Sequence, residues 1–401
     1  MTEPMLPAGS PPTGARRRAI AFIVLIGCVS LFADMTYEGG RSIAGPFLGS
    51  LGASAVVVST VAGLGEFLGY GVRYLSGRAA DRQGRYWPIM IGGYLVNLLS
   101  VPLLALAGSW PVAVLLLIAE RVGRAIRSPI RSAMLSHAAS RTGAGWGFGL
   151  HTALDQTGGT AGPLLVAGLL AIGAGYRWSF AVLLLPALAS LAVLAAARIL
   201  YPDPRRLELR VSRADLAAWS GFDRTFRIYT AAAALVGAGF ADFALIGFHL
   251  TRAGVTPPAW IPLLYALAMA VEGLGALALG RLLDRRGSGV VPVAIAVAAL
   301  ATPLLFLGGA AAAVAGAGLW GIGTAVQDTI FYALLGRDVP ADRRATAYGL
   351  FDLMRGTAWL AGSVVLGVLY AVSLPALVAT SLVLQLAAAV VLGIGGRSSA
   401  Q

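Results

Sequence analysis

Long apolar stretches follow one another along nearly the whole of this 401-residue chain, and each is long enough to cross a membrane. A helix needs about 20 apolar residues to span a hydrocarbon core of roughly 30 Å. Charged residues make up only 12% of the chain, whereas about 25% is usual in soluble domains, so most of the surface must face lipid. The stretches are interrupted by Gly and Pro and lack the ten-residue alternation of a membrane β-barrel. The sequence therefore predicts an all-α polytopic membrane protein with twelve transmembrane helices, at about 19–45, 51–77, 86–108, 110–135, 144–173, 176–200, 225–252, 258–283, 288–308, 310–335, 343–371 and 373–395.

The charged residues of the connections predict how these helices are oriented. All 30 basic residues are Arg, and the net charge is +12. Three of them precede the first stretch and others fill every second connection, whereas the alternate connections carry little more than Arg177 and Arg252. By the positive-inside rule we expect both termini in the cytoplasm and the protein in the plasma membrane. A nucleic-acid partner is not expected, because that role needs a basic patch with reading or stacking groups on a soluble face.

The two halves of the chain resemble each other. "FADMTYEGGR" at 32 recurs as "FADFALIGFH" at 240, which aligns Asp34 with Asp242 and Arg41 with His249. "GRAADRQG" at 77 recurs as "GRLLDRRG" at 280. Duplicated halves are typical of secondary transporters, which bind substrate between the repeats near the membrane midplane. We expect a cytoplasmic tail over 1–18, a six-helix bundle over 19–200, a cytoplasmic linker over 201–224, a pseudo-symmetric six-helix bundle over 225–395 and a cytoplasmic tail over 396–401.

Ionisable side chains occur inside the predicted spans. Each costs roughly 2.5–3.5 kcal/mol at the bilayer centre, so together they would outweigh a typical net stability of about 5–15 kcal/mol if they faced lipid. They must therefore face one another or a water-filled cavity. The residues concerned are Asp34, Glu38, Arg41, Glu66, Arg73, Glu120, Arg121, Arg124, Arg127, Asp155, Asp242, Glu272, Asp328, Asp352 and Arg355.

The first span places three of these groups on one helix face. Asp34, Glu38 and Arg41 are spaced by four and three residues, which brings their side chains together on a helix. Two carboxylates this close repel each other when both are ionised, so we expect Glu38 or Asp34 to carry the coupling proton. Arg41 can neutralise one of the two charges. The alternative is a static cluster of ion pairs with the arginines of the fourth span.

The loop "GRAADRQGR" (77–85) resembles the signature that the major facilitator superfamily carries between its second and third helices. That resemblance implies a cytoplasmic gate between the two halves, in which a carboxylate beside arginines stabilises the closed state through charge-assisted hydrogen bonds. A weaker copy lies at 280–287. The gate residues implied by the two copies are Gly77, Asp81, Arg82, Gly84, Arg85, Asp284 and Arg285.

Two further segments are similar to the same superfamily. "ERVGRAIRSPIR" (120–131) resembles the Arg-bearing fourth helix of proton-coupled members, which implies a role in proton transfer for Arg121 or Arg124. "FGLHTALDQTGGTAGP" (148–163) resembles the Gly-rich fifth helix of the antiporter branch. There, Gly158, Gly162 and Pro163 form a packing motif, because small residues let membrane helices approach closely.

Other polar residues of the spans have simpler interpretations. Arg127 and Arg131 are expected to extend toward the cytoplasmic surface along their own helix. Asp352 and Arg355 are spaced as a local ion pair. The tenth span has no Arg in "TAVQDT" (324–329), so the ionic residues are expected to act mainly in the first half.

These patterns lead to two sets of candidate residues. The candidates for proton coupling are Asp34, Glu38, Arg121, Arg124 and Asp155. The candidates for lining a cavity or binding substrate are Arg41, Glu66, Tyr70, Arg73, His151, Asp242, His249 and Glu272.

The sequence therefore predicts a secondary active transporter, similar to drug/proton antiporters, that exports a small molecule and uses the proton gradient as its energy source. An alternative is a proton-coupled importer or exchanger of a small anion, which Arg41, Arg73, Arg121 and Arg124 could bind. An enzyme is not expected, because neither H-E-x-x-H nor G-x-S-x-G is present. One cysteine and three histidines make a metal site unexpected, and no cofactor is expected. We expect a monomer whose partners are its substrate and the lipid bilayer.

Overall fold

The computed structural model describes residues 13–83, 86–139, 144–202, 224–339 and 344–397, which form helices and no strand. The prediction of an all-α membrane protein is confirmed. The first half comprises α1 (Thr13–Ser50), α2 (Ala55–Gln83), α3 (Tyr86–Leu103), η1 (Leu104–Leu106), α4 (Trp110–Ala139), α5 (Ala144–Ala171), α6 (Gly175–Val182) and α7 (Leu184–Leu200). The second half comprises α8 (Arg224–Gly239), α9 (Phe243–Arg252), α10 (Trp260–Arg286), α11 (Val290–Ala299), α12 (Ala301–Leu307), α13 (Ala310–Ala325), η3 (Val326–Ile330), α14 (Phe331–Asp338), α15 (Arg344–Val372) and α16 (Leu374–Arg397).

Within the described residues, 10 helical segments are long and apolar enough to cross a membrane. They coincide with predicted spans. The remaining two predicted spans coincide with α4 and α5, which have 30 and 28 residues. α4 is less apolar because its first five turns contain Glu120, Arg121, Arg124 and Arg127. α5 is less apolar because it is rich in Gly and Thr and contains Asp155 and Gln156.

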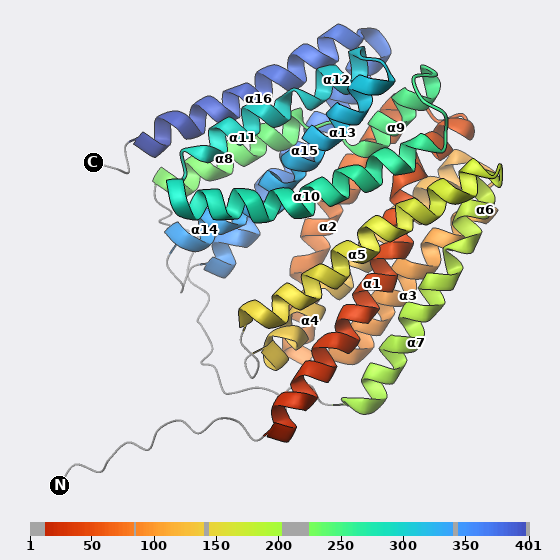
Figure 1. Cartoon of the computed structure of the whole chain (residues 1–401), viewed down its shortest axis with the longest axis vertical. Coiled ribbons are helices and arrows are strands. Elements are labelled where there is room, and N and C mark those ends of the chain that lie inside the picture. The colour runs from red at the N-terminus through yellow and green to blue at the C-terminus, as the bar shows by residue number, and fades with distance from the viewer. Residues whose placement is uncertain (1–12, 84–85, 140–143, 203–223, 340–343, 398–401) are drawn as a thin grey trace.

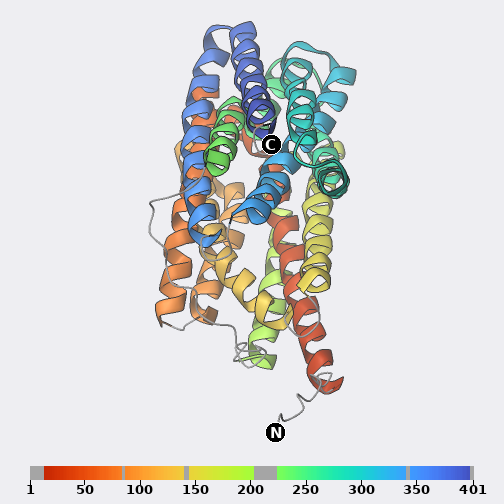
Figure 2. The ribbon, with the colours of Figure 1, turned by 90° about the vertical axis from the view of Figure 1, so that its left-hand side faces the viewer.

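The helices of each half pack mainly on one another (Figure 1). Between the halves, α2 packs along α15, α1 contacts α9, and α5 contacts α10. The halves separate toward the left of Figure 1, where α1 begins and α16 ends, and Figure 2 looks onto this side. We call it the diverging side, and we call the opposite side, where α1 ends beside α9, the converging side.

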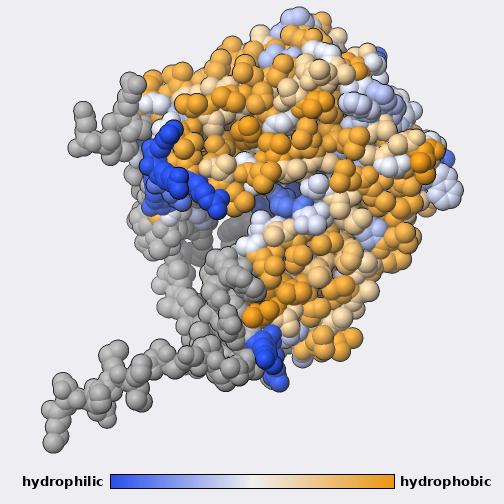
Figure 3. All heavy atoms as spheres, viewed as in Figure 1, coloured by the Kyte–Doolittle hydropathy of each residue, from blue (hydrophilic) through white to orange (hydrophobic). Residues whose placement is uncertain are grey.

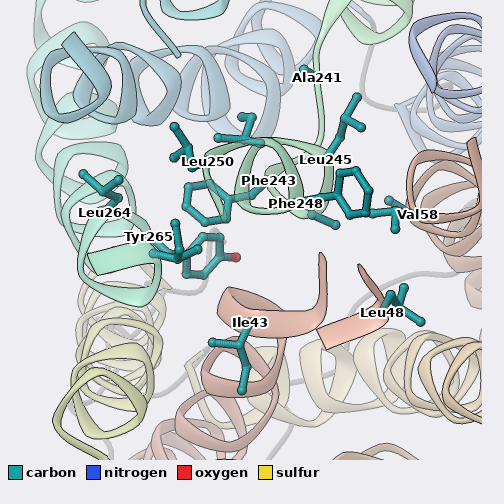
Figure 4. Close-up of a cluster of buried hydrophobic side chains, with 14 of the residues drawn as sticks. Ile43, Leu48, Val58, Ala241, Phe243, Leu245, Phe248, Leu250, Leu264 and Tyr265 are labelled. Carbon is teal, nitrogen blue, oxygen red and sulfur yellow. The ribbon is translucent and has the colours of Figure 1, made fainter. Parts of the chain in front are cut away.

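A cluster of buried apolar side chains joins the two halves on the converging side (Figure 4). Ile43 and Leu48 of α1 lie opposite Phe243 and Phe248 of α9, and Tyr265 of α10 completes the contact. Phe243 and Tyr265 pack edge to face with ring centroids 4.6 Å apart. Close packing of this kind, rather than exclusion of water, holds helices together in lipid.

Glycines allow α5 to lie against the backbone of α1. A Cβ atom at Gly158 would lie 2.0 Å from the carbonyl oxygen of Leu31, and one at Gly162 would lie 2.1 Å from that of Met35. Pro163 follows inside α5. The helices could not be this close with larger residues at these positions.

We expect Gly162→Val to destabilise the folded protein by roughly 1–3 kcal/mol or more, because its side chain would displace backbone rather than a flexible side chain. Gly168→Val is the matched control, since a Cβ atom there meets nothing within 4 Å. Thermal unfolding of both variants in detergent measures the difference. Equal unfolding temperatures would contradict the close α1–α5 contact.

Two helical segments of the second half are interrupted next to ionisable residues. The chain leaves helical geometry between α8 and α9, where Asp242 caps α9 by accepting a hydrogen bond from the Ala244 amide at 2.9 Å. A π-helical turn, η3, separates α13 from α14, and there the Gln327 carbonyl accepts a hydrogen bond from Arg355 Nη1 at 2.9 Å. Irregular backbone is tolerated at membrane depth only where protein or a wet cavity covers it, and π-turns are frequent at functional sites.

The predicted gate motif is only partly visible. Asp284 and Arg285 are exposed near the end of α10. The first copy lies outside the part of the chain whose side chains the structure describes, namely Gly77, Asp81, Arg82, Gly84 and Arg85.

Candidate functional site

A ladder of ionic contacts connects α1 with α4. Glu38 Oε1 lies 3.7 Å from Arg124 Nη1, and Asp34 Oδ1 lies 3.7 Å from Arg127 Nη2. The two helices run in opposite directions, so Asp34, the earlier acid of α1, lies opposite Arg127, the later arginine of α4. Both acids are buried, with 8% and 4% of their surface exposed. We call Asp34, Glu38, Arg124 and Arg127 the α1–α4 ladder.

Arg41 takes partners from other helices. Its Nη2 lies 3.0 Å from Glu66 Oε1 and 3.4 Å from Asp242 Oδ2. The expectation that it neutralises an acid of its own helix is therefore corrected, because α2 and the break before α9 bring other carboxylates directly to its guanidinium. Glu66 Oε1 also accepts a hydrogen bond from Arg121 Nη1 at 2.8 Å, so this carboxylate bridges two arginines.

The prediction that Arg127 and Arg131 extend to the surface is wrong. Arg127 is 1% exposed, and its Nε donates to Asn97 Oδ1 at 3.0 Å. Arg131 Nη1 donates to Ser30 Oγ at 2.9 Å and to Asp155 Oδ1 at 3.3 Å. Polar partners on α1, α3 and α5 hold both guanidinium groups inside the protein, where a charge is stable only if it is paired.

Asp155 of α5 is a further acid of this region, and its Oδ1 accepts the Arg131 hydrogen bond described above. Asp34 Oδ1 is buried and has no hydrogen-bond partner among the described residues. His151, the neighbouring candidate on α5, has its Nε2 2.9 Å from Ser30 Oγ. Asp34 and Asp155 thus both lie against arginines of α4.

Among the described residues, three hydrogen bonds between two side chains cross from one half to the other. Arg41 meets Asp242 as described above. The Tyr265 hydroxyl donates a hydrogen bond to Glu38 Oε2. The Arg355 guanidinium donates to the Tyr70 hydroxyl. We call these pairs the cross-half contacts: Arg41–Asp242, Glu38–Tyr265 and Tyr70–Arg355.

The expected local pair of Asp352 with Arg355 does not form. Arg355 Nη1 lies 3.0 Å from Asp328 Oδ1, while Asp352 accepts a hydrogen bond from the Tyr332 hydroxyl. The π-turn places the Asp328 carboxylate and the Gln327 carbonyl next to the Arg355 guanidinium. Arg355 therefore pairs with these groups instead of with Asp352. The absence of Arg from "TAVQDT" therefore does not leave the second half without a buried cation.

The remaining candidates lie at different places. Glu272 of α10 is half-buried, and its described surroundings provide no basic group within 4.0 Å. His249 packs on the converging side, with Nδ1 3.1 Å from the Tyr370 hydroxyl and its ring 5.0 Å from that of Phe306. Arg73 of α2 lines a cavity.

That cavity has a volume of about 270 Å³ and lies among α1, α2, α4 and α5. Figure 3 shows hydrophilic atoms recessed between two largely hydrophobic halves. A second cavity, of about 40 Å³, lies beside Arg41 and Asp242. The charged or aromatic residues that line the larger cavity are Tyr37, Arg73, Arg124, Arg127, Arg131 and Asp155.

Two residues of this site were not among the candidates. Tyr265 was one of many aromatic residues in the spans, and nothing local marked it as the partner of Glu38. Asn97 is the only Asn in the chain and lies in an apolar span. It binds Arg127 as well as Glu120, whose Oε1 accepts from Asn97 Nδ2 at 2.9 Å. A lone amide in such a span is a usable signal for a buried polar contact.

The helical fold and its recessed ionic interior define a membrane transporter rather than an enzyme. Residues 26–363 match the sequence model of the Major Facilitator Superfamily, and the chain belongs to this superfamily. The resemblance seen in the loop motif is thereby confirmed.

Relatives and solved structures agree with this assignment. An uncharacterized protein of Mycobacterium tuberculosis is 40% identical over 387 residues, covering 94% of each chain. An uncharacterized MFS-type transporter of Methanocaldococcus jannaschii is 32% identical over 143 residues, covering 36% of each. A mutant of the nucleoside transporter NupG superposes with a TM-score of 0.74 at 14% identity, covering 92% of this chain and 99% of NupG. The peptide transporter POT in complex with sulfate gives 0.74 at 14% identity, covering 94% of each. At these identities the structural likeness concerns the fold alone.

Proposed function

We propose that this protein is a proton-coupled secondary transporter that moves a small solute by alternating access. The proposal includes twelve membrane crossings in two pseudo-symmetric six-helix bundles, both termini in the cytoplasm and a place in the plasma membrane. The diverging side is then the cytoplasmic side.

The cross-half contacts are the observation that carries this proposal. They join buried charged or hydroxyl groups of one half to those of the other, and rocking one half against the other must break them. Each broken contact leaves a buried polar group that needs water, a proton or a substrate in its place. Such an interface favours two discrete arrangements of the halves over a continuous range.

Glu38 is the carboxyl group best placed to couple this motion to a proton. It accepts a hydrogen bond from Tyr265 of the other half and lies 3.7 Å from Arg124 of its own half. When the halves part on the converging side, Glu38 keeps Arg124 and loses Tyr265. Whether it holds a proton therefore depends on which side is open, which is the requirement for coupling.

Two transport modes use this arrangement. Export of a drug or metabolite in exchange for protons is favoured by the similarity of residues 148–163 to the antiporter branch. Proton-coupled import or exchange of a small anion is favoured by the arginine-lined cavity.

Reconstituted vesicles test the shared proposal. The vesicles contain the full chain and carry a pH gradient, and panels of cationic, neutral and anionic solutes are offered as substrates. We expect uptake of a solute that stops when a protonophore collapses the gradient. Cells that overproduce the protein separate the modes, because an exporter raises tolerance to its toxic substrate and an importer raises accumulation. Flux that is indifferent to the pH gradient would overturn proton coupling.

A further inference from the structure

The larger cavity carries an excess of positive charge. Arg73, Arg124, Arg127 and Arg131 line it, and Asp155 is the acid among its lining residues. Three of the arginines come from α4, so the excess is built into one helix and does not depend on a flexible loop. A water-filled hollow with one sign of charge concentrates solutes of the opposite sign.

Among the described residues, three guanidinium N–H groups of the arginines that line this cavity have no hydrogen-bond partner. They belong to Arg73 Nε, Arg124 Nη1 and Arg127 Nη1, and all three atoms are buried. The carboxylates nearest to Arg124 and Arg127, which are Glu38 and Asp34, stay at 3.7 Å. This distance exceeds that of a charge-assisted hydrogen bond, about 2.7–2.9 Å. Buried donors without partners are rare in native proteins and point to a missing ligand or water.

Arg131 of the same cavity has hydrogen-bond partners for its Nη1 group. It donates to Ser30 and to Asp155. The other three arginines lie over aromatic rings: Arg124 lies 4.8 Å and Arg127 5.6 Å from the ring centre of Tyr37, and Arg73 lies 5.6 Å from that of Tyr70. Arg127 also donates one hydrogen bond, from Nε to Asn97. Stacking on an aromatic ring positions a guanidinium group without using its N–H donors. The three arginines are thus oriented but not saturated.

We propose that this cavity binds a small oxyanion, such as a carboxylate, sulfate or phosphate group, between Arg73, Arg124 and Arg127. The inference rests on the proposed function and assigns its substrate class. An oxyanion supplies several acceptor oxygens, and guanidinium groups match its geometry better than water does. The volume of about 270 Å³ accommodates a small solute. A drug-like cation would face the uncompensated arginines and is disfavoured.

Equilibrium binding to the purified full chain tests the site without a proton gradient. Sulfate, phosphate and succinate are the probes, chloride salts at matched ionic strength are the reference, and the shift in unfolding temperature and calorimetric binding are the readouts. We expect at least one oxyanion to bind and to stabilise the protein. Arg124→Gln and Arg73→Gln should each weaken that binding about tenfold or more, because each removes a charge-assisted contact. Arg177→Gln, at an exposed arginine of α6 outside the cavity, should leave the affinity unchanged.

Several results would overturn the inference. They are the absence of binding by every oxyanion, equal affinity in the Arg124→Gln and Arg177→Gln variants, or stabilisation by vesicles of a phosphate-bearing lipid but by no free anion. Because Arg124→Gln could unfold the protein, Arg124→Lys serves as a second variant, in which the charge persists and the fork geometry is lost. Proton-driven flux of a cation with no anion binding would contradict the anion site but not the proposed function. Anion binding with no proton-driven flux would instead contradict the proposed function and support the anion site.

Discussion

In the Glu38→Gln variant, proton-driven flux is expected to fall by about two orders of magnitude, which is within the range seen when a proton-transferring group is removed. The amide can still accept the hydrogen bond from the Tyr265 hydroxyl, so the halves keep their contact. It cannot take up or release a proton. Exchange of labelled for unlabelled substrate, which needs no net proton movement, should therefore continue.

Parallel assays of driven uptake and of exchange in the same vesicles measure this separation. Asp352→Asn is the matched control, since Asp352 is also an intramembrane acid that accepts from a tyrosine, but it lies outside the α1–α4 ladder and the cross-half contacts. Unchanged driven uptake in Glu38→Gln would remove Glu38 from the coupling role. Asp34, the other acid of the α1–α4 ladder, would then be the next group to test by Asp34→Asn.

Gly45→Val is expected to abolish transport while leaving the protein folded. A Cβ atom at Gly45 would lie 1.8 Å from the carbonyl oxygen of Ala244, so a side chain there cannot coexist with the contact between α1 and α9. That contact joins the two halves, and in the proposed alternating access it must open when they part on the converging side. The variant should therefore shift the protein toward the other arrangement. Overpacking of about 1–3 kcal/mol corresponds to a roughly 5- to 150-fold change in population.

Labelling of an introduced cysteine reports this shift. Ser59 is 1% exposed and donates to the Ser363 carbonyl across the halves, so Ser59→Cys in a Cys28→Ser background should react slowly with a water-soluble maleimide. Adding Gly45→Val should speed the reaction. Adding Gly162→Val, which acts inside the first half, should lower stability without this selective effect. Equal labelling rates with and without Gly45→Val would contradict a converging side that opens.

Local features of this protein could be predicted from the sequence, whereas contacts between helices could not. The helices could be predicted because length and apolarity are local properties, and a long apolar segment has few alternatives in lipid. The intramembrane acids and arginines were predicted to avoid lipid for the same reason. Asp34 and Glu38 do lie inward, opposite the arginines of α4.

The partners of individual charged groups could not be predicted in this way. Asp352 lies three residues before Arg355 in sequence, yet Arg355 pairs with Asp328 of the π-turn η3. Arg127 belongs to a series of arginines along α4, yet Asn97 of α3 holds it inside. Spacing along one helix defines a face, but the rotation and depth of the neighbouring helices determine what that face meets.

The sequence by itself thus determined that lipid surrounds most of this protein, that its fold is helical and that its ionic groups lie inside. Each follows from the cost of placing polar groups in hydrocarbon. Only the tertiary structure decided which half contributes each partner, and hence that Glu38 and Arg41 connect the two halves while three arginines keep unused donors around a cavity. The contacts of Arg41 and Glu38 across the halves join residues 201 and 227 positions apart, and no local pattern records where the chain brings them together.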